Sequence, residues 1–334
     1  MSLGVGLVGL GEIGQYHLPG IRSSEHAELV AVCDLDAELA ERSAAGEAAV
    51  CGSLDEVLAM DQVEVVDLCL PHHLHLPAAV QALEAGRHVI LEKPMAIGLP
   101  ACREISAVAD RVDRMVGVSH NQIFFLPHQE LARSIEAGAL GGLRSIRCQL
   151  TIGGKYGGWR EDPETAGGGL LYDAGVHRVY MAQMLGGRVE SVSARMDSPR
   201  SEDRFLVSLQ FESGVLGTLD GTYHAPEGVF DDRIEVVGTE GMARVRGCEA
   251  FFEGYLADGP ILEVFSEGSW VSSDVADGWD DSVARSVGAM LASIDSGESP
   301  AVDARVAGST VAVIEAAYES AESGGAPVVV GDAE

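Results

Sequence analysis

The first third of the chain alternates between short segments that are apolar at almost every position and segments with a helical pattern. The apolar segments, expected as strands, lie at residues 3–8, 27–34, 63–70, 88–92 and 115–118. Helices are expected between them, at residues 13–23, 37–45, 77–85 and 101–111. Strands without in-and-out alternation are buried on both faces, and intervening helices make the sheet parallel. Residues 1–119 are therefore predicted to form a doubly wound α/β domain.

After about residue 120 the pattern becomes typical of a half-exposed sheet, as in the strict alternation of residues 205–211. Strands are expected at residues 144–152, 189–196, 204–212, 215–223, 233–237 and 242–247, with a short apolar run at 328–330. Helices are expected at residues 127–137, 173–185, 280–296 and 303–323. Residues 120–334 thus predict an α+β domain with a large open, mostly antiparallel sheet. The helix at 303–323 can pack back on the first domain.

The composition excludes several classes of partner. Lys and Arg total 22 against 52 Asp and Glu, a formal net charge of −30, which repels nucleic-acid backbones and anionic membranes. Six cysteines without a CxxC pair indicate free thiols in a reducing cytoplasm. No apolar run reaches the roughly 18–20 residues that a membrane span needs, and no signal peptide is expected. The lysines are only two, Lys93 and Lys155.

A glycine motif, G-x-G-x-x-G, follows the first expected strand and opens a helix. Its members are Gly9, Gly11, Glu12, Ile13 and Gly14, with Leu10 between the first two glycines. The first glycine permits a tight turn, the second lets a pyrophosphate approach, and the third allows close packing of helix and strand. The helix N-terminus offers N–H groups to phosphates. The alternative is a glycine-rich structural turn, but the context favours dinucleotide binding.

Asp34 ends the second expected strand, 20 positions after Gly14. A carboxylate there accepts hydrogen bonds from ribose hydroxyls and repels a 2′-phosphate. Leu35 follows, with no Arg or Ser beside it to bind that phosphate. The position favours NAD over NADP. The alternative is a strand-end Asp that caps the next helix.

Three histidines lie in the segment that leaves the third apolar strand. The segment runs through Pro71, His72, His73, Leu74 and His75. The carboxyl end of a parallel strand is where dinucleotides bind, so Pro71, His72 and His75 are predicted to line the nicotinamide ribose. A plain loop with a helix cap is one alternative. A metal site is another alternative, and none is predicted.

Two further segments carry groups suited to proton chemistry. Glu92-Lys93-Pro94 closes a strand, because proline cannot continue a sheet ladder, and its last side chains are expected to face the cleft. Asp173 and His177 lie four apart on the helix expected after three glycines, so they share one face. Taken alone, these two are better explained as an acid in the first turn of a helix and a histidine on the helix surface.

The chain resembles the Gfo/Idh/MocA family of oxidoreductases over nearly its whole length. The resemblance rests on the glycine loop at 9–14, on Pro71 to His75 with Ala78, Ala82 and Leu83, on 85–94 (AGRHVILEKP), on Glu136-Ala137-Gly138 with Gly141, on Trp159-Arg160 and on 167–177 (GGGLLYDAGVH). It implies an NAD(P)-binding Rossmann domain followed by a substrate-binding domain. It also implies a homodimer or homotetramer formed through the second domain's sheet.

The resemblance further implies that Lys93, Asp173 and His177 form the catalytic set, with Glu92 and Lys93 also at the cofactor. Two positions differ from the family pattern. Tyr180 stands where relatives often have an acid three residues after the histidine, and residues 121–124 (NQIF) lack an Arg that is frequent there. The substrate therefore cannot be copied from any one relative.

The implied reaction is reversible oxidation of a secondary alcohol on a sugar, cyclitol or related polyol. His177 is expected to be the general base, because an imidazole titrates near working pH. Asp173 would orient the substrate and stabilise charged His177, and Lys93 would donate to the reacting oxygen. Substrate contacts are expected from Asn121, Tyr156, Trp159 and Arg160, against ordinary loop packing for the last three.

Three other functions remain open. One is a redox-neutral NAD-dependent glycosidase or lyase of the same fold, in which the cofactor is regenerated in each cycle. Another is a non-catalytic dinucleotide-binding regulator, because a fold does not fix a function. The third is reduction of a nucleotide-linked keto-sugar, which predicts basic groups for a diphosphate.

Overall fold

The computed structural model describes residues 2–246, 260–273, 275 and 277–332. The chain folds into two compact units. Unit 1 holds residues up to 121 together with 283–311, and unit 2 holds 122–282 together with 312–332. The helices α10 (Trp279–Ser296) and α11 (Ala304–Glu322) each contribute to both units.

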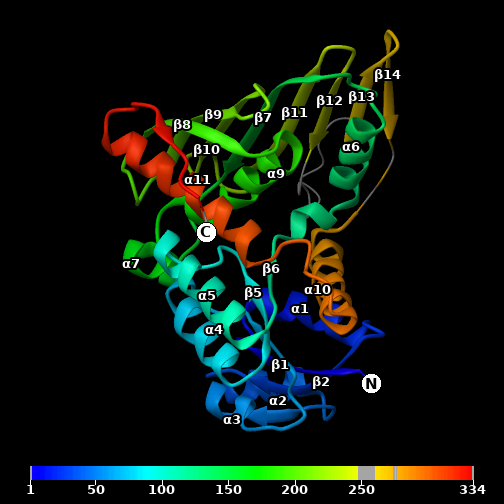
Figure 1. Ribbon diagram of the computed structural model, residues 1–334, viewed down its shortest axis with the longest axis vertical. Helices are drawn as coiled ribbons and strands as arrows, with labels where there is room; N and C mark the ends of the chain where they lie inside the picture. The colour runs from blue at the N-terminus through cyan, green and yellow to red at the C-terminus, as the bar shows by residue number, and fades with distance from the viewer. Residues whose placement is uncertain (1, 247–259, 274, 276, 333–334) are drawn as a thin grey trace. The chain divides into compact units, whose positions relative to one another are not determined.

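Unit 1 is built on a six-stranded parallel sheet in the order β3-β2-β1-β4-β5-β6. Its strands are β1 (Leu3–Val8), β2 (Ala27–Cys33), β3 (Ala49–Cys51), β4 (Val65–Leu68), β5 (His88–Glu92) and β6 (Val116–Ser119). Its helices are α1 (Glu12–Arg22), α2 (Ala37–Ala44), α3 (Leu54–Leu58), the 3-10 turn η1 (His72–Leu74), α4 (His75–Glu84) and α5 (Leu99–Val112). The predicted doubly wound domain is confirmed (Figure 1).

The core of unit 1 joins the central strands to the helices that cover them. Val5, Leu7 and Ile90 of the sheet are fully buried, together with Ile21 of α1 and Leu291 of α10. Gly20 lets α10 approach α1 closely, because a Cβ there would lie 2.6 Å from the carbonyl oxygen of Ala284. Strands buried on both faces explain why their sequences lack alternation.

Unit 2 contains a nine-stranded sheet in the order β14-β13-β12-β11-β7-β10-β9-β8-β15. Its strands are β7 (Leu143–Ile152), β8 (Val189–Met196), β9 (Arg204–Phe211), β10 (Leu216–Thr222), β11 (Phe230–Gly238), β12 (Met242–Arg246), β13 (Leu262–Ser266), β14 (Ser269–Ser273) and β15 (Val328–Val329). Among the described strand pairs of this second sheet, only β7–β10 is parallel. The prediction of a large, mostly antiparallel sheet is confirmed.

Helices cover one face of this sheet. The helices α6 (Leu126–Glu136), α8 (Leu170–Asp173) and α9 (Val176–Gly186) pack against it. The same part of the chain also forms α7 (Pro163–Ala166) and the 3-10 turns η2 (Asn121–Phe124) and η3 (Gly158–Glu161). The helix α9 packs on β7 and β10, and α6 packs on β12 (Figure 1). Along β9 every second residue is buried and the others are exposed, so the opposite face of the sheet is open.

The single helix expected at 173–185 is wrong. Two helices occupy this segment, α8 ending at Asp173 and α9 beginning at Val176. The corner at Gly175 is tight, because a Cβ there would lie 2.7 Å from the α-carbon of Leu171. The helical sequence pattern continues through this corner, which hid the break.

The described cysteines, Cys33, Cys51, Cys69, Cys102 and Cys148, are free and buried. Cys248 lies outside the described residues. Among the described helices, none is long and apolar enough to cross a membrane.

Candidate active site

The glycine loop forms a cradle at the carboxyl end of β1. Gly9 has φ +90°, and a Cβ there would lie 2.2 Å from the carbonyl oxygen of Cys69. A Cβ at Gly14 would lie 2.1 Å from the carbonyl oxygen of Gly9. These two glycines are required by the fold itself. At Gly11 an added Cβ would meet nothing within 4 Å, so the space in front of it is open.

The helix α1 starts directly behind this open space. No side chain caps its first N–H groups at Gly11. Uncapped N–H groups at a helix N-terminus, with the partial positive charge of the helix, suit a phosphate. The loop therefore fits the pyrophosphate of a dinucleotide.

Asp34, which follows β2, is hydrogen-bonded to the same loop. One carboxylate oxygen accepts the N–H of Leu10 at 2.6 Å, and the other accepts the N–H of Asp36 at 2.9 Å. A carboxylate has about four acceptor positions, so two hydrogen bonds leave capacity for ribose hydroxyls. Leu35 beside it is fully exposed.

The histidine segment after β4 is partly a structural link. His75 is fully buried, and its two ring nitrogens lie 2.8 Å from the carbonyl oxygens of Pro94 and Leu70. The side chain thus joins the loop after β4 to the loop after β5. His72 is also buried, whereas His73 is exposed.

Glu92 is the last residue of β5, and Lys93 follows it. Glu92 is 6% exposed and accepts the N–H of Lys93 at 3.2 Å. Lys93 itself is half-buried. His17 of α1 lies 3.1 Å from the other oxygen of Glu92, and its second ring nitrogen faces Asp67 of β4.

His120 and Asn121 follow β6 at the same sheet edge. Both are buried. Burial lowers the pKa of His120 to about 3, an effect that the charge of nearby Glu92 offsets only in part. A neutral imidazole therefore stands beside Glu92 and Lys93.

Unit 2 contains a pocket of about 240 Å³ in front of α8. Three predicted residues line it, namely Asp173, Tyr156 and Arg160. The Arg160 Nε donates to an Asp173 oxygen at 3.0 Å, and its guanidinium lies 4.3 Å from the centre of the Trp159 ring. The remaining lining residues are Lys155, Glu161, Pro163, Gly168, Gly169, Ser201, Glu202, Asp203 and Tyr223.

The pocket is acidic, and its cations are already paired. Lys155 lies 2.5 Å from Asp203, and Arg160 is bound to Asp173. Glu161 and Glu202 add two further carboxyl groups. A lining of this kind offers hydrogen-bond acceptors to hydroxyl groups. Among its described residues, each cation is already paired with a carboxylate, so none is left to bind a phosphate.

Glu202 fixes the start of α8 from beneath. It is fully buried and accepts hydrogen bonds from the N–H groups of Leu171 at 2.8 Å and Gly169 at 3.3 Å, and from the Tyr318 hydroxyl at 3.1 Å. Burial raises its pKa to about 7, although these hydrogen bonds act in the opposite direction. Glu202 thereby holds the helix whose last residue is Asp173.

His177 is the second residue of α9 and is 8% exposed. The structure thus places Asp173 and His177 on consecutive helices of unit 2. Lys93, Asn121 and the cofactor candidates belong to unit 1.

Sequence reasoning missed His17, Asp67, His120 and Glu202. Asp67 had a signal, because it is a charged residue in the otherwise apolar strand Val65–Leu68. His120 directly precedes the predicted Asn121. Glu202 stands in a polar loop and has no distinguishing sequence signal.

Two family models match the chain. Residues 3–120 match the oxidoreductase family with an NAD-binding Rossmann fold, and residues 128–244 match the GFO/IDH/MocA C-terminal domain. Together they cover the glycine loop, Lys93, Asp173 and His177.

The relatives of the chain include proteins named as dehydrogenases. The chain is 32% identical over 221 residues to 1-carboxy-3-chloro-3,4-dihydroxycyclohexa-1,5-diene dehydrogenase of Comamonas testosteroni, a match covering 63% of this chain and 55% of that protein. It is 29% identical over 339 residues to D-xylose 1-dehydrogenase (NADP(+)) 2 of Haloferax volcanii, covering 96% and 98%. It is 32% identical over 259 residues to inositol 2-dehydrogenase 4 of Saccharopolyspora erythraea, covering 74% of each.

A solved structure agrees with these matches. GenD2 from gentamicin A biosynthesis, in complex with NAD, superposes with a TM-score of 0.83 at 27% identity, covering 99% of this chain and 97% of that one. The family models, the relatives and the solved structure thus point to the same family for both parts of the chain. The chain belongs to the Gfo/Idh/MocA family of oxidoreductases.

Proposed function

We propose that the protein is an NAD-dependent dehydrogenase that oxidises a secondary alcohol of an unphosphorylated sugar, cyclitol or related polyol. The observation that carries the proposal is the cradle in unit 1, where Gly11 and the uncapped start of α1 face open space. Lys93 stands at the carboxyl edge of the same sheet. Relatives named as sugar and inositol dehydrogenases support the substrate class.

In this proposal, residues at the carboxyl ends of four strands of unit 1, β1, β2, β4 and β5, hold the cofactor. Gly9, Gly11, Glu12, Ile13 and Gly14 bind the pyrophosphate, Asp34 binds the adenosine ribose, and Pro71, His72, Glu92 and Lys93 surround the nicotinamide end. The predicted cofactor residue His75 instead holds the loops after β4 and β5 together from within. When bound, nicotinamide supplies the hydride acceptor or donor. The chain's own residues bind and orient the cofactor and the substrate, and they move the proton.

Three side chains carry the acid–base work. His177 takes the proton from the reacting hydroxyl, and Lys93 donates a hydrogen bond to the same oxygen as negative charge develops on it. Asp173 orients the substrate, and its hydrogen bond from Arg160 fixes one of its oxygens. Unit 1 thus serves as the dinucleotide-binding part and unit 2 as the substrate-binding part.

The pocket of unit 2 supports a neutral polyol as substrate. Its carboxyl groups can accept hydrogen bonds from hydroxyls, and Tyr156 and Arg160 line it, with the Trp159 ring against the Arg160 guanidinium. Asn121 is a further proposed substrate contact, because it lies two residues after the end of β6, the last strand of the unit 1 sheet in chain order. A nucleotide-linked keto-sugar needs basic groups for its diphosphate, and Lys155 and Arg160 are both bound to carboxylates.

Gly11→Ala tests the cradle. Its φ of −58° is open to any residue, and the added methyl enters space that nothing else fills, so the fold is expected to persist. Because that space is assigned to the pyrophosphate, we expect NADH binding to weaken about tenfold or more, which is ~1.4 kcal/mol. Titration of NADH fluorescence measures the effect, and the same titration with NADPH is expected to show weaker binding because of Asp34.

Gly288→Ala is the matched control. This glycine lies in α10, and a Cβ there also meets nothing within 4 Å. The variant should bind NADH as the unaltered protein does. Unchanged NADH affinity in Gly11→Ala would refute the assignment of the loop, and tighter binding of NADPH than NADH would refute the role of Asp34.

We also propose a homodimer or homotetramer that forms through the open face of the unit 2 sheet. Leu206 and Leu216 stand on that face with exposed fractions of 52% and 61%. The family resemblance implies contacts between subunits through this sheet, and these two exposed leucines are the apolar groups that such contacts would cover. Light scattering should give two or four times the chain mass, and Leu206→Glu should lower it. A monomer at all concentrations would contradict the proposal.

A further inference from the structure

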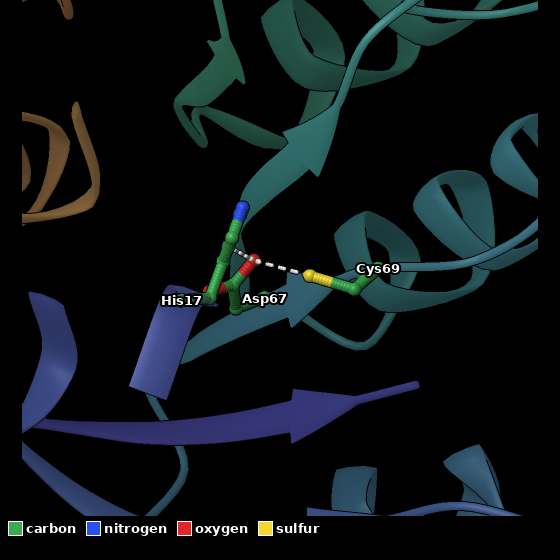
Figure 2. A group of neighbouring side chains, drawn as sticks. All are labelled: His17, Asp67 and Cys69. Carbon is green, nitrogen blue, oxygen red and sulfur yellow. Dashed lines mark hydrogen bonds and ion pairs between the residues drawn. The ribbon is translucent and has the colours of Figure 1, made fainter. Parts of the chain in front are cut away.

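A row of charged side chains is buried beneath the carboxyl edge of the unit 1 sheet. The Nδ1 of His17 lies 2.9 and 3.1 Å from the two oxygens of Asp67, and its Nε2 lies 3.1 Å from an oxygen of Glu92. His17 and Asp67 are both 0% exposed. Figure 2 shows the carboxylate of Asp67 between the imidazole of His17 and the sulfur of Cys69, with dashed lines for their hydrogen bonds.

The geometry defines the protonation state of His17. An ionised carboxylate only accepts hydrogen bonds, so an imidazole between two carboxylates must donate from both nitrogens and carry a positive charge. Burial alone would lower the pKa of His17, but the charge of Asp67 raises it well above 6.5. For Glu92, burial alone would raise the pKa. The hydrogen bond and the charge of His17 outweigh burial, so the pKa of Glu92 is lowered.

A metal ion explains this cluster less well than a proton does. The ligand atoms of His17, Asp67 and Cys69 lie within 4.8 Å of one another. The Cys69 Sγ, however, donates a hydrogen bond to an Asp67 oxygen at 3.9 Å in this arrangement. A metal ligand would be the thiolate. The imidazolium already supplies the positive charge that the two carboxylates require.

The row connects the glycine loop to Lys93 within one unit. His17 belongs to α1, the helix that starts at Gly11. Glu92, at the other end, accepts the main-chain N–H of Lys93 through its second oxygen at 3.2 Å. Each link is a hydrogen bond to a charged group, the stronger kind, and burial shields it from water.

We propose that His17 is a positioning residue for Lys93: a buried imidazolium that neutralises Glu92 and fixes the turn carrying the lysine to the helix behind the cofactor cradle. The inference rests on the proposed role of Lys93. His17 is fully buried, so it acts through Glu92 and not on the substrate. Without its charge, Glu92 becomes an uncompensated carboxylate next to Lys93 and draws the ammonium away from the reacting oxygen.

The protonation state can be measured directly. In protein labelled with ¹⁵N-histidine, nitrogen chemical shifts distinguish a doubly protonated ring from a neutral tautomer. At about pH 8 an ordinary histidine is neutral, whereas His17 is expected to remain doubly protonated. The signal that disappears in His17→Gln identifies it. A neutral ring for His17 at this pH overturns the inference.

The effect on Lys93 can be measured in the same variant. The chain has only two lysines, so ¹³C-lysine labelling gives two side-chain signals, and Lys155→Arg assigns them. In His17→Gln the Lys93 signal is expected to shift while the Lys155 signal, from unit 2, stays in place. An unmoved Lys93 signal overturns the inference.

Kinetics provide the third measurement. His17→Gln is expected to lower kcat about 10- to 100-fold, as for other small misplacements of a catalytic group, with NADH affinity changed less than about threefold. Adding Glu92→Gln removes the uncompensated carboxylate and should recover part of kcat. Unchanged kcat in an active enzyme counts against the inference.

The two claims can fail separately. A protonated His17 and a shifted Lys93 signal in a protein that oxidises no polyol would uphold the positioning network and refute the proposed function. Should His17→Gln not fold, Asp67→Asn keeps the imidazole and removes the carboxylate that charges it. In that variant His17 is expected to lose its second proton at about pH 8, and retention of that proton would overturn the positioning network.

Discussion

Lys93→Ala and His177→Ala are each expected to lose about 10²–10⁴-fold in kcat, the usual contribution of general acid–base catalysis, while NADH still binds. The Lys93→Ala variant lacks the proposed hydrogen bond to the reacting oxygen. The His177→Ala variant has no imidazole to take the hydroxyl proton. Neither change touches the glycine cradle, so NADH affinity should change only a few-fold. Initial rates with NAD and a turned-over polyol, beside NADH titration, separate the two effects.

Two comparisons sharpen this prediction. Lys93→Arg keeps the positive charge but replaces a compact ammonium with a planar fork, so it should recover little activity. His26→Ala removes a surface histidine that is paired with Asp295, and its rate should match that of the unaltered enzyme. Full activity in either Lys93→Ala or His177→Ala would remove that residue from the catalytic set.

Arg178→Ala is expected to give the largest loss of stability, about 3–5 kcal/mol in the free energy of unfolding. Arg178 of α9 and Asp232 of β11 form an ion pair in which both side chains are 1% exposed. Its removal leaves the Asp232 carboxylate buried without that countercharge. Burial makes the neighbours His128 and Cys148 neutral, with pKa values of about 3 and about 12, so neither replaces the lost charge.

A double variant is the control for this prediction. Arg178→Met with Asp232→Leu removes both charges and fills the space with apolar groups. Such replacements are often neutral or stabilising, so the double variant should be clearly more stable than Arg178→Ala. Urea unfolding monitored by circular dichroism gives both values. A loss below about 1 kcal/mol in Arg178→Ala would show that the pair contributes little.

The sequence predicted the elements whose patterns are local. The buried strands of unit 1 are apolar at nearly every position, and β9 alternates strictly, so both are visible in a short window. The strand β3 and the helix α3 were missed because they have three and five residues. The strands β13 and β14 were missed because most of their residues are partly or fully exposed and give no apolar pattern.

The candidate site was predictable where its residues closely follow strands in the sequence. The glycine loop, Asp34 and Glu92-Lys93-Pro94 follow strands in sequence, and position after a strand is a local signal. The partners of His17 are 50 and 75 positions away, and no pattern in one sequence reports pairs so distant. Glu202 was missed for the same reason, because its hydrogen-bond partners lie 31 to 116 positions away.

The central claim is that this chain oxidises a neutral polyol with NAD. The most direct measurement is the absorbance of reduced nicotinamide when the protein and NAD meet a panel of sugars, cyclitols, sugar phosphates and nucleotide-linked sugars. We expect NADH to form with at least one unphosphorylated polyol, and this activity to be lost in His177→Ala. Tight NADH binding with no NADH formed from any member, or turnover of phosphorylated members alone, would contradict the claim.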